Sequence, residues 1–139
     1  MVFYRNITSA KEYIFHPINA FHLLKRMSEW LPKISPDSNI LKIFFKNKTS
    51  TLETASFGIV DVQEFYQLKT DDLAKGLIKD PDSGKEYMAR GKLTSEELLL
   101  VAESASQSKY LDRHVEWLQT ALKQAKAEQR DKNLLLDIR

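Results

Sequence analysis

Apolar residues recur at intervals of three and four along most of this chain, which is the spacing of the buried face of an amphipathic helix. The first such segment covers residues 13–31. Pro17 suits the first turn of this helix, where a missing N–H costs nothing, and Pro32 and Pro36 predict its end. Its predicted buried face consists of Ala20, Leu24, Met27 and Leu31, and Phe21 and Leu23 widen it.

A second helix is predicted over residues 52–66, where the apolar positions again fit one face. Thr70 then fits the N-cap of a short helix, and Gly76 fits the stop after it, because glycine tolerates the left-handed backbone that ends many helices. Periodicity does not decide between helix and strand for residues 37–47, and the helical neighbours favour helix. The predicted face of the second helix consists of Leu52, Ala55, Ile59, Val62 and Tyr66.

The segment Lys-Asp-Pro-Asp-Ser-Gly-Lys at residues 79–85 predicts a turn or linker. Beyond it, Thr94 and Glu97 form the pattern of a capping box, in which each side chain bonds to the backbone N–H of the other residue. A helix is therefore predicted to start there. Its predicted buried face consists of Leu98, Val101, Ala102 and Ala105.

A further helix is predicted from near Leu111, and another over residues 131–139. Small residues at Ala102, Ala105 and Ala121 would let the two longer helices approach closely, as in a helical hairpin of tetratricopeptide type. About three such repeats are normally needed to cover the outer faces, so the C-terminus is expected to be interrupted. The predicted buried face of the later helix consists of Leu111, Val115, Leu118, Leu122 and Ala125.

Composition supports an all-α fold and narrows the chemistry. The 139 residues include four Gly and four Pro, too few for a turn-rich β fold, and no Cys, which excludes zinc–thiolate sites and thiol catalysis. A net charge of +2 gives no electrostatic case for binding nucleic acid or an anionic membrane. No apolar run approaches the roughly 20 residues of a membrane span. Residues 1–10 lack a signal-peptide pattern, so the protein is expected to be cytosolic or to lack its true start.

The sequence around His16 resembles that of a known enzyme family. It reads Tyr-Ile-Phe-His-Pro-Ile-Asn-Ala-Phe over residues 13–21 and continues with Lys25, Arg26 and Trp30. This is similar to Tyr-Leu-x-His-Pro-Val-Asn-Ala-Tyr in the N-terminal region of the alpha subunit of collagen prolyl 4-hydroxylase. The segment Val-Gln-Glu-Phe-Tyr-Gln-Leu over residues 62–68 is similar to a later stretch of that region.

A third resemblance lies beyond the predicted linker. Leu-Thr-Ser-Glu-Glu over residues 93–97 and Trp-Leu-Gln-Thr-Ala-Leu-Lys-Gln over residues 117–124 resemble the opening helices of the peptide-substrate-binding domain in the same family, which has a tetratricopeptide fold. The three matches imply a helical, bundle-like N-terminal assembly region, then a linker, then the truncated start of a peptide-substrate-binding domain. These divisions cover residues 1–78, 79–91 and 92–139, respectively.

The resemblance implies a biological setting. The full alpha subunit of the family is several times longer and hydroxylates proline in collagen-like repeats in the lumen of the endoplasmic reticulum. Its catalytic domain uses Fe(II), 2-oxoglutarate, O2 and ascorbate. It assembles with protein disulfide isomerase as the beta subunit and with a second alpha subunit. The collagen-like proline-rich peptide is expected to bind only to a longer chain than this one.

The iron ligands of the family, a His-x-Asp pair and a distant His, have no counterpart in this sequence. Asp112 and His114 occur in reversed order, and His16 and His22 lie six residues apart on different faces of a helix. We therefore predict no catalytic residue, no metal ligand and no cofactor in this chain. We also predict no substrate-binding residue, because Ser106 stands where the family has its first groove tyrosine.

Two other features have a chemical reading. Asn6 and Asn47 each begin an Asn-x-Thr sequon, which the resemblance to a family of the endoplasmic reticulum makes credible as an N-glycosylation site. Trp30 and Trp117 each flank an apolar helical stripe, and so packing in the core or at an interface is predicted for both rather than ligand stacking.

The sequence therefore predicts a non-catalytic fragment or truncated form of a procollagen-proline 4-dioxygenase alpha subunit. Its expected contribution is subunit assembly and the positioning of the proline-rich peptide-binding domain. The alternative is a stand-alone helical protein-interaction module, either a truncated paralogue or a tetratricopeptide-like adaptor, with no role in hydroxylation.

Overall fold

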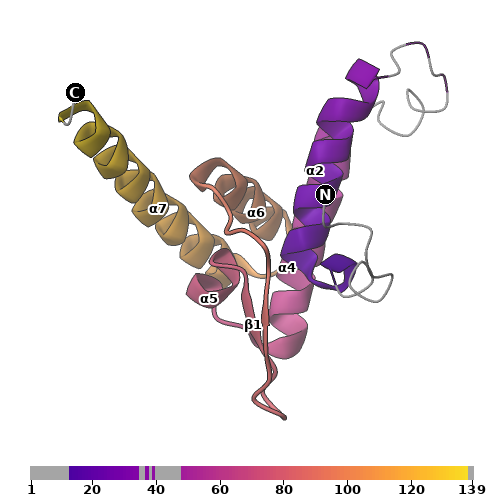
Figure 1. The fold of residues 1–139 in the computed structure, drawn as a ribbon. Helices are drawn as coiled ribbons and strands as arrows, with labels where there is room; N and C mark the ends of the chain where they lie inside the picture. Colours follow the sequence, from indigo (N-terminus) through magenta and orange to yellow (C-terminus); the bar gives the residue numbers. More distant parts are fainter. Residues whose placement is uncertain (1–12, 35–36, 38, 40–47, 138–139) are drawn as a thin grey trace.

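A computed structural model of the chain describes residues 13–34, 37, 39 and 48–137. The fold is all-α, as predicted, with one small antiparallel β-hairpin between the fifth and sixth helices of the numbering in Figure 1. The helices are α2 (Pro17–Ile34), α4 (Lys48–Tyr66), α5 (Thr70–Ala74), α6 (Ser95–Gln107) and α7 (Leu111–Asp137). The strands are β1 (Leu77–Lys79) and β2 (Glu86–Met88), so the turn predicted over residues 79–85 is the turn of this hairpin.

Helix α2 is present where it was predicted, but its buried face is only partly the predicted one and it ends later. Phe21, at the edge of the predicted stripe, is fully buried as expected, and so is Ile18, which was not part of the stripe. Met27 is exposed, and the rest of the predicted stripe is half-buried. The helix passes through Pro32 and ends at Ile34. Pro32 lies in the last turn, where its missing N–H removes only one helical hydrogen bond, and so it does not stop the helix as predicted.

Helix α4 packs against both α2 and α6, and this central position widens its buried face. Leu52 and Ile59 are buried as predicted, whereas Tyr66 at the end of the helix is exposed. Val60 and Gln63 are also fully buried, although neither was part of the predicted stripe. A helix between two neighbours buries more than the single stripe that periodicity assigns to it.

Helix α5 is followed by the glycine stop predicted from the sequence. Gly76 has a φ of 88°, and a Cβ there would lie 2.8 Å from the Cβ of Ala89. The prediction for Thr70 was wrong, because Lys69 is the N-cap and provides no side-chain bond. Thr70 is the first helical residue and is buried.

Helices α6 and α7 form an antiparallel hairpin, since Ala102 lies beside His114 and Ser95 lies beside Glu128. The capping box of Thr94 and Glu97 is present, and the predicted face of α6 is buried. The small residues Ala102, Ala105 and Ala121 are buried too, as expected for close packing of the two helices.

Helix α7 differs from its prediction in two respects. It continues as one helix to Asp137, so the separate helix predicted from Asp131 is not formed. Its buried residues are Trp117 and Ala121, whereas the predicted face is exposed, including Leu118 and Leu122. The assignment of the hairpin to the tetratricopeptide type stays a prediction.

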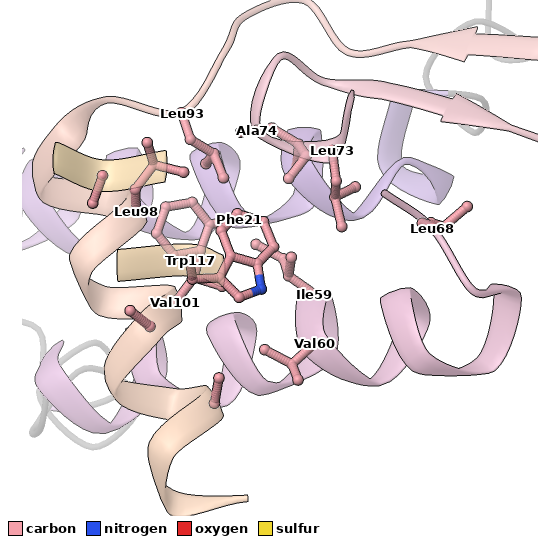
Figure 2. Close-up of a cluster of buried hydrophobic side chains, with 14 of the residues drawn as sticks. Phe21, Ile59, Val60, Leu68, Leu73, Ala74, Leu93, Leu98, Val101 and Trp117 are labelled. Atoms are coloured by element: carbon pink, nitrogen blue, oxygen red, sulfur yellow. The ribbon is translucent and has the colours of Figure 1, made fainter. Parts of the chain in front are cut away.

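The indole of Trp117 lies at the centre of the hydrophobic core, among Phe21, Ile59 and Leu98 (Figure 2). This core includes residues from both sides of the predicted boundary at residues 79–91. The helices before and after the hairpin are therefore packed around shared side chains, and the division into domains stays a prediction. Among the described residues, no helix has the length and apolarity needed to cross a membrane.

Candidate interaction site

Side chains of the His16-Pro17-Ile18-Asn19 motif connect the start of α2 to the ends of the β-hairpin by hydrogen bonds. The Nε2–H of His16 donates to the carbonyl oxygen of Gly76 at 2.8 Å, and its Nδ1 accepts from the N–H of Ile18 at 3.2 Å. Asn19 Oδ1 accepts from the N–H of Arg90 at 3.0 Å. The motif that carries the resemblance thus satisfies backbone groups far away in sequence.

The imidazole of His16 is neutral in this arrangement, because Nδ1 is occupied as an acceptor. Burial lowers the pKa of His16, and the backbone carbonyls of Gly76 and Tyr87 offset this only in part. A ring with one donor bond and one acceptor bond has no free nitrogen for a metal or a proton-transfer role.

Farther along α2, His22 and Lys25 hold the start of α6. His22 Nε2 lies 3.1 Å from Glu97 Oε2, and Lys25 Nζ lies 3.3 Å from the same oxygen. Glu97 Oε1 also accepts from the backbone N–H of Thr94 at 2.9 Å. Burial alone would raise the pKa of Glu97, but these hydrogen bonds and charges lower it to about 2.

A polar network connects α7 to α4 and α5 beneath the core. The buried side chain of Gln63 accepts from Trp117 Nε1 at 2.8 Å and donates to Thr70 Oγ1 at 2.7 Å. Thr70 in turn donates to Glu116 Oε2 at 2.6 Å, and Arg113 pairs with that carboxylate. This network was not predicted, because a polar residue on an amphipathic helix is ordinarily assigned to the solvent face.

An open groove of about 1110 Å³ lies between the start of α2, the end of α4 and the β-hairpin. Its lining includes four aromatic rings beside aliphatic side chains, and one of these rings, that of Phe15, is 80% exposed. Lysines and carboxylates of the hairpin, including Lys85 and Glu86, lie among the lining residues. We name this surface the aromatic groove and define its apolar lining by Tyr13, Phe15, Tyr66, Tyr87 and Met88.

The aromatic groove has the character of a binding surface rather than of a catalytic site. Contiguous exposed apolar side chains with a charged border are typical of protein interaction surfaces. The ammonium of Lys85 lies 5.3 Å from the centre of the Tyr87 ring, a distance at which the cation and the ring attract each other. The groove was not predicted, because its residues come from three separate segments of the chain.

The structure places the remaining residues of the sequence analysis as follows. His114 donates from Nδ1 to the carbonyl oxygen of Ala102 at 2.7 Å. Trp117 is buried, as predicted, whereas Trp30 is 59% exposed and does not pack in the core, so that interface packing of Trp30 stays a prediction. Asn6 and Asn47 lie outside the described residues, as does nearly all of the segment over residues 37–47.

The three histidines are thus in separate surroundings, and two of them are in contact with backbone carbonyls. Within the part of the chain that the structure describes, no group of three or more His, Asp or Glu side chains is placed to hold a metal ion. The described residues form helices joined by hydrogen bonds and ion pairs, with an exposed aromatic groove.

Comparison with known proteins identifies the region that contains α2, α4, α5 and most of the residues that line the groove. A model of the prolyl 4-hydroxylase alpha-subunit N-terminal region matches residues 4–80. Comparisons with curated proteins and with solved structures give no match. The matched residues make up more than half of the sequence, and the chain therefore belongs to the family of the prolyl 4-hydroxylase alpha subunit, through the N-terminal region of that subunit.

Proposed function

We propose that this chain is a non-catalytic assembly unit of a procollagen-proline 4-dioxygenase alpha subunit. The observation that carries the proposal is the family match over residues 4–80. This range contains α2, α4 and α5 and most of the residues that line the aromatic groove. In this proposal the groove binds the beta subunit, of the protein disulfide isomerase type, in the lumen of the endoplasmic reticulum. Fe(II), 2-oxoglutarate and ascorbate serve a catalytic domain on a longer chain.

The use of the histidines supports a structural role for this part of the subunit. His16 and His114 each bond to a backbone carbonyl, and His22 pairs with the carboxylate of Glu97. Each side chain therefore has a task in holding the helices together. The proposal assigns to helices α6 and α7 the positioning of the proline-rich peptide-binding domain.

Co-expression with a protein disulfide isomerase-type subunit tests the proposal. We expect the two chains to copurify and expect Phe15→Ser to weaken their association, because it removes an exposed ring from the groove lining. Phe65→Ser is the matched control, since Phe65 is 81% exposed but is not part of that lining. The absence of copurification with the unaltered chain, or an equal loss with both variants, would reject the groove as the assembly surface.

Catalysis is tested separately. The purified chain, incubated with Fe(II), 2-oxoglutarate, ascorbate and a proline-rich peptide, is expected to form no hydroxyproline above the blank. Measurable hydroxyproline would contradict the assignment of a non-catalytic role.

A second candidate is a stand-alone helical interaction module with no role in hydroxylation. The exposed apolar face of α7 favours it, because that face is available to a partner whether or not the subunit assembles. Binding of a partner by α7 in the absence of any beta subunit would be expected for the assembly unit and for the stand-alone module alike. Failure of the chain to bind the beta subunit would leave only the stand-alone module.

A further inference from the structure

His16 caps the start of α2 through its backbone and through its side chain. Its carbonyl oxygen accepts from the N–H of Ala20 at 3.0 Å, and its Nδ1 accepts from the N–H of Ile18 at 3.2 Å. The first N–H groups of a helix have no partner within the helix, and a side-chain acceptor beside them supplies one. The lone pair on Nδ1 is therefore in use as long as the ring is neutral.

The other ring nitrogen connects this helix start to the base of the β-hairpin. The Nε2–H of His16 donates to the carbonyl oxygen of Gly76 at 2.8 Å, and the same oxygen accepts from the N–H of Ala89 at 2.7 Å. Gly76 directly precedes β1, and Ala89 directly follows β2. We name the two bonds of the ring, from Nδ1 to Ile18 and from Nε2 to Gly76, the His16 latch.

A proton on Nδ1 is incompatible with the His16 latch. The ring would then present an N–H to the N–H of Ile18, and its positive charge would lie at the N-terminus of α2, where the helix dipole disfavours a cation. His16 is only 6% exposed, so water stabilises this charge poorly. The carbonyl oxygens of Gly76 and Tyr87 favour the charged ring, but burial outweighs them and lowers the pKa of His16.

The groove beside His16 contains charged side chains of both signs, and all of them come from the hairpin or from Arg90 just after it. The tyrosines of the lining come from three parts of the chain, with Tyr13 before α2, Tyr66 at the end of α4 and Tyr87 on β2. Because cations and carboxylates lie together, the desolvation and the bonds of the ring itself dominate its proton uptake. The charged lining residues are Lys79, Asp80, Asp82, Lys85, Glu86 and Arg90.

We propose that the His16 latch is a pH-sensitive switch that controls the width of the aromatic groove. When the ring takes up a proton from solvent at Nδ1, its side chain turns into the groove, which it already lines, and the start of α2 separates from the hairpin. The groove lies between these two parts, with Phe15 on one wall and Tyr87 and Met88 on the other. Proton uptake therefore moves the two walls apart.

The opening is local, because the hairpin does not need His16 to stay formed. Ile78 remains paired with Tyr87 in the two-stranded sheet, and the N–H of Ala89 keeps its bond to Gly76. Asn19 Oδ1 still accepts from the N–H of Arg90, so the hairpin remains tethered to α2 at one point. A raised pH closes the latch again.

The sign of the response distinguishes His16 from His22 on the same helix. His22 Nε2 lies 3.1 Å from the carboxylate of Glu97, so a proton on His22 strengthens the contact between α2 and α6. The pKa of His16 in the folded protein lies below its ordinary value of 6.5. The latch is therefore fully closed above pH 6.5 and is lost as the pH falls through the lower pKa of the folded protein.

A pair of spin labels on the two walls of the groove tests the opening, because the chain has no cysteine of its own. Labels on Ile14→Cys and Glu86→Cys, both at exposed positions, are expected to lie farther apart at about pH 5 than at about pH 8. Labels on Leu99→Cys and Leu122→Cys, which join α6 to α7, are the control and are expected to keep their distance. An unchanged distance across the groove would overturn the proposal.

His16→Gln separates the proton from the hydrogen bonds. Its side-chain amide has a donor for Gly76 and an acceptor for Ile18 but does not titrate, so the label distance across the groove is expected to become independent of pH. His22→Gln is the matched control and is expected to retain the full pH response. A response that persists in His16→Gln, or one that is lost in His22→Gln, would assign the switch to another group and overturn the proposal.

The consequence for assembly rests on the proposed function. Affinity for the beta subunit is expected to fall by up to about tenfold per pH unit on acidification, because one proton is linked to closure of the groove, and His16→Gln is expected to abolish this fall. A change of label distance without copurification at any pH would reject the beta-subunit role and leave the latch intact. Copurification that is equally strong at about pH 8 and about pH 5 would reject control of the groove by the latch and leave the assembly role intact.

Discussion

Helices α6 and α7 form one hairpin, and yet the apolar face predicted for α6 is buried while the face predicted for α7 is exposed. Both faces were identified from the same helical periodicity. Helix α6 has neighbours on two sides, α4 and α7, and its predicted face packs against them. Helix α7 has a second apolar surface around Trp117 and Ala121, and that surface enters the core.

Hydrogen bonds as well as apolar area decide which face of α7 is buried. The indole N–H of Trp117 reaches Gln63, and Thr120 Oγ1 lies 3.3 Å from Asp71 Oδ1. These bonds orient α7 toward α4 and α5 and leave its predicted apolar face exposed. A helix with two apolar faces is oriented by the face that also has hydrogen-bonding partners, because an unsatisfied buried polar group is costly.

The largest effect on stability is expected from truncation of Trp117, the residue through which α7 enters the core. We expect Trp117→Ala to lower the free energy of unfolding by about 4 kcal/mol, because the ring is fully buried and its loss leaves a cavity and an unpaired Gln63. Urea unfolding followed by circular dichroism measures the change. Trp30→Ala is the matched control and is expected to cost about 0.5 kcal/mol or less, since Trp30 is exposed. Equal effects of the two substitutions would show that α7 does not enter the core through Trp117.

The anchoring of α6 is tested by pH. The pKa of Glu97 is lowered from 4.5 to about 2 in the folded protein, so the unfolded chain takes up the proton first as the pH falls. The stabilisation is therefore fully present above pH 4.5 and is lost between pH 4.5 and pH 2. It amounts to at most about 3 kcal/mol, reduced by solvent screening.

Comparison with Glu97→Gln isolates this contribution from those of other carboxylates. The variant is expected to be less stable at neutral pH and to lose less stability on acidification, because its amide does not titrate. Stability curves of the two proteins that run parallel from pH 5 to pH 2 would mean that Glu97 does not anchor α6 through its charge.

A smaller effect is expected at the N-cap of α6. The side chain of Thr94 accepts from the N–H of Glu97, and Thr94→Ala is expected to cost roughly 1 kcal/mol of stability. Thr94→Ser keeps the hydroxyl and is expected to preserve most of that stability. A melting temperature of Thr94→Ala equal to that of the unaltered chain would place the start of α6 elsewhere.

Local signals were sufficient for the start of α6 and the stop after α5. The capping box at Thr94 and the glycine at Gly76 depend on backbone groups within a few residues, so their sequence patterns were informative. The burial of Gln63 and the exposure of Trp30 depend on where distant helices pack. The aromatic groove likewise combines three segments, and no pattern within one segment encodes their meeting.

The positions of Pro32 and Asp131 show the same limit at helix ends. Proline was taken to stop α2, but a proline in the last turn costs one hydrogen bond, which the packing of the helix offsets. A new helix was predicted from Asp131, but nothing in the sequence there prevents α7 from continuing. A helix-breaking residue ends a helix only where the residues beyond it gain nothing from packing as helix.

The smallest expected effect concerns the exposed apolar face of α7. Leu122→Ala is expected to change the free energy of unfolding by about 0.5 kcal/mol or less, because Leu122 is 58% exposed. Leu98→Ala, at a fully buried position of α6, is the matched control and is expected to cost about 3 kcal/mol. Chemical denaturation at low protein concentration measures both. If Leu122→Ala were as costly as Leu98→Ala, the predicted apolar face of α7 would be covered within the fold, and the contrast between the two helices would have to be abandoned.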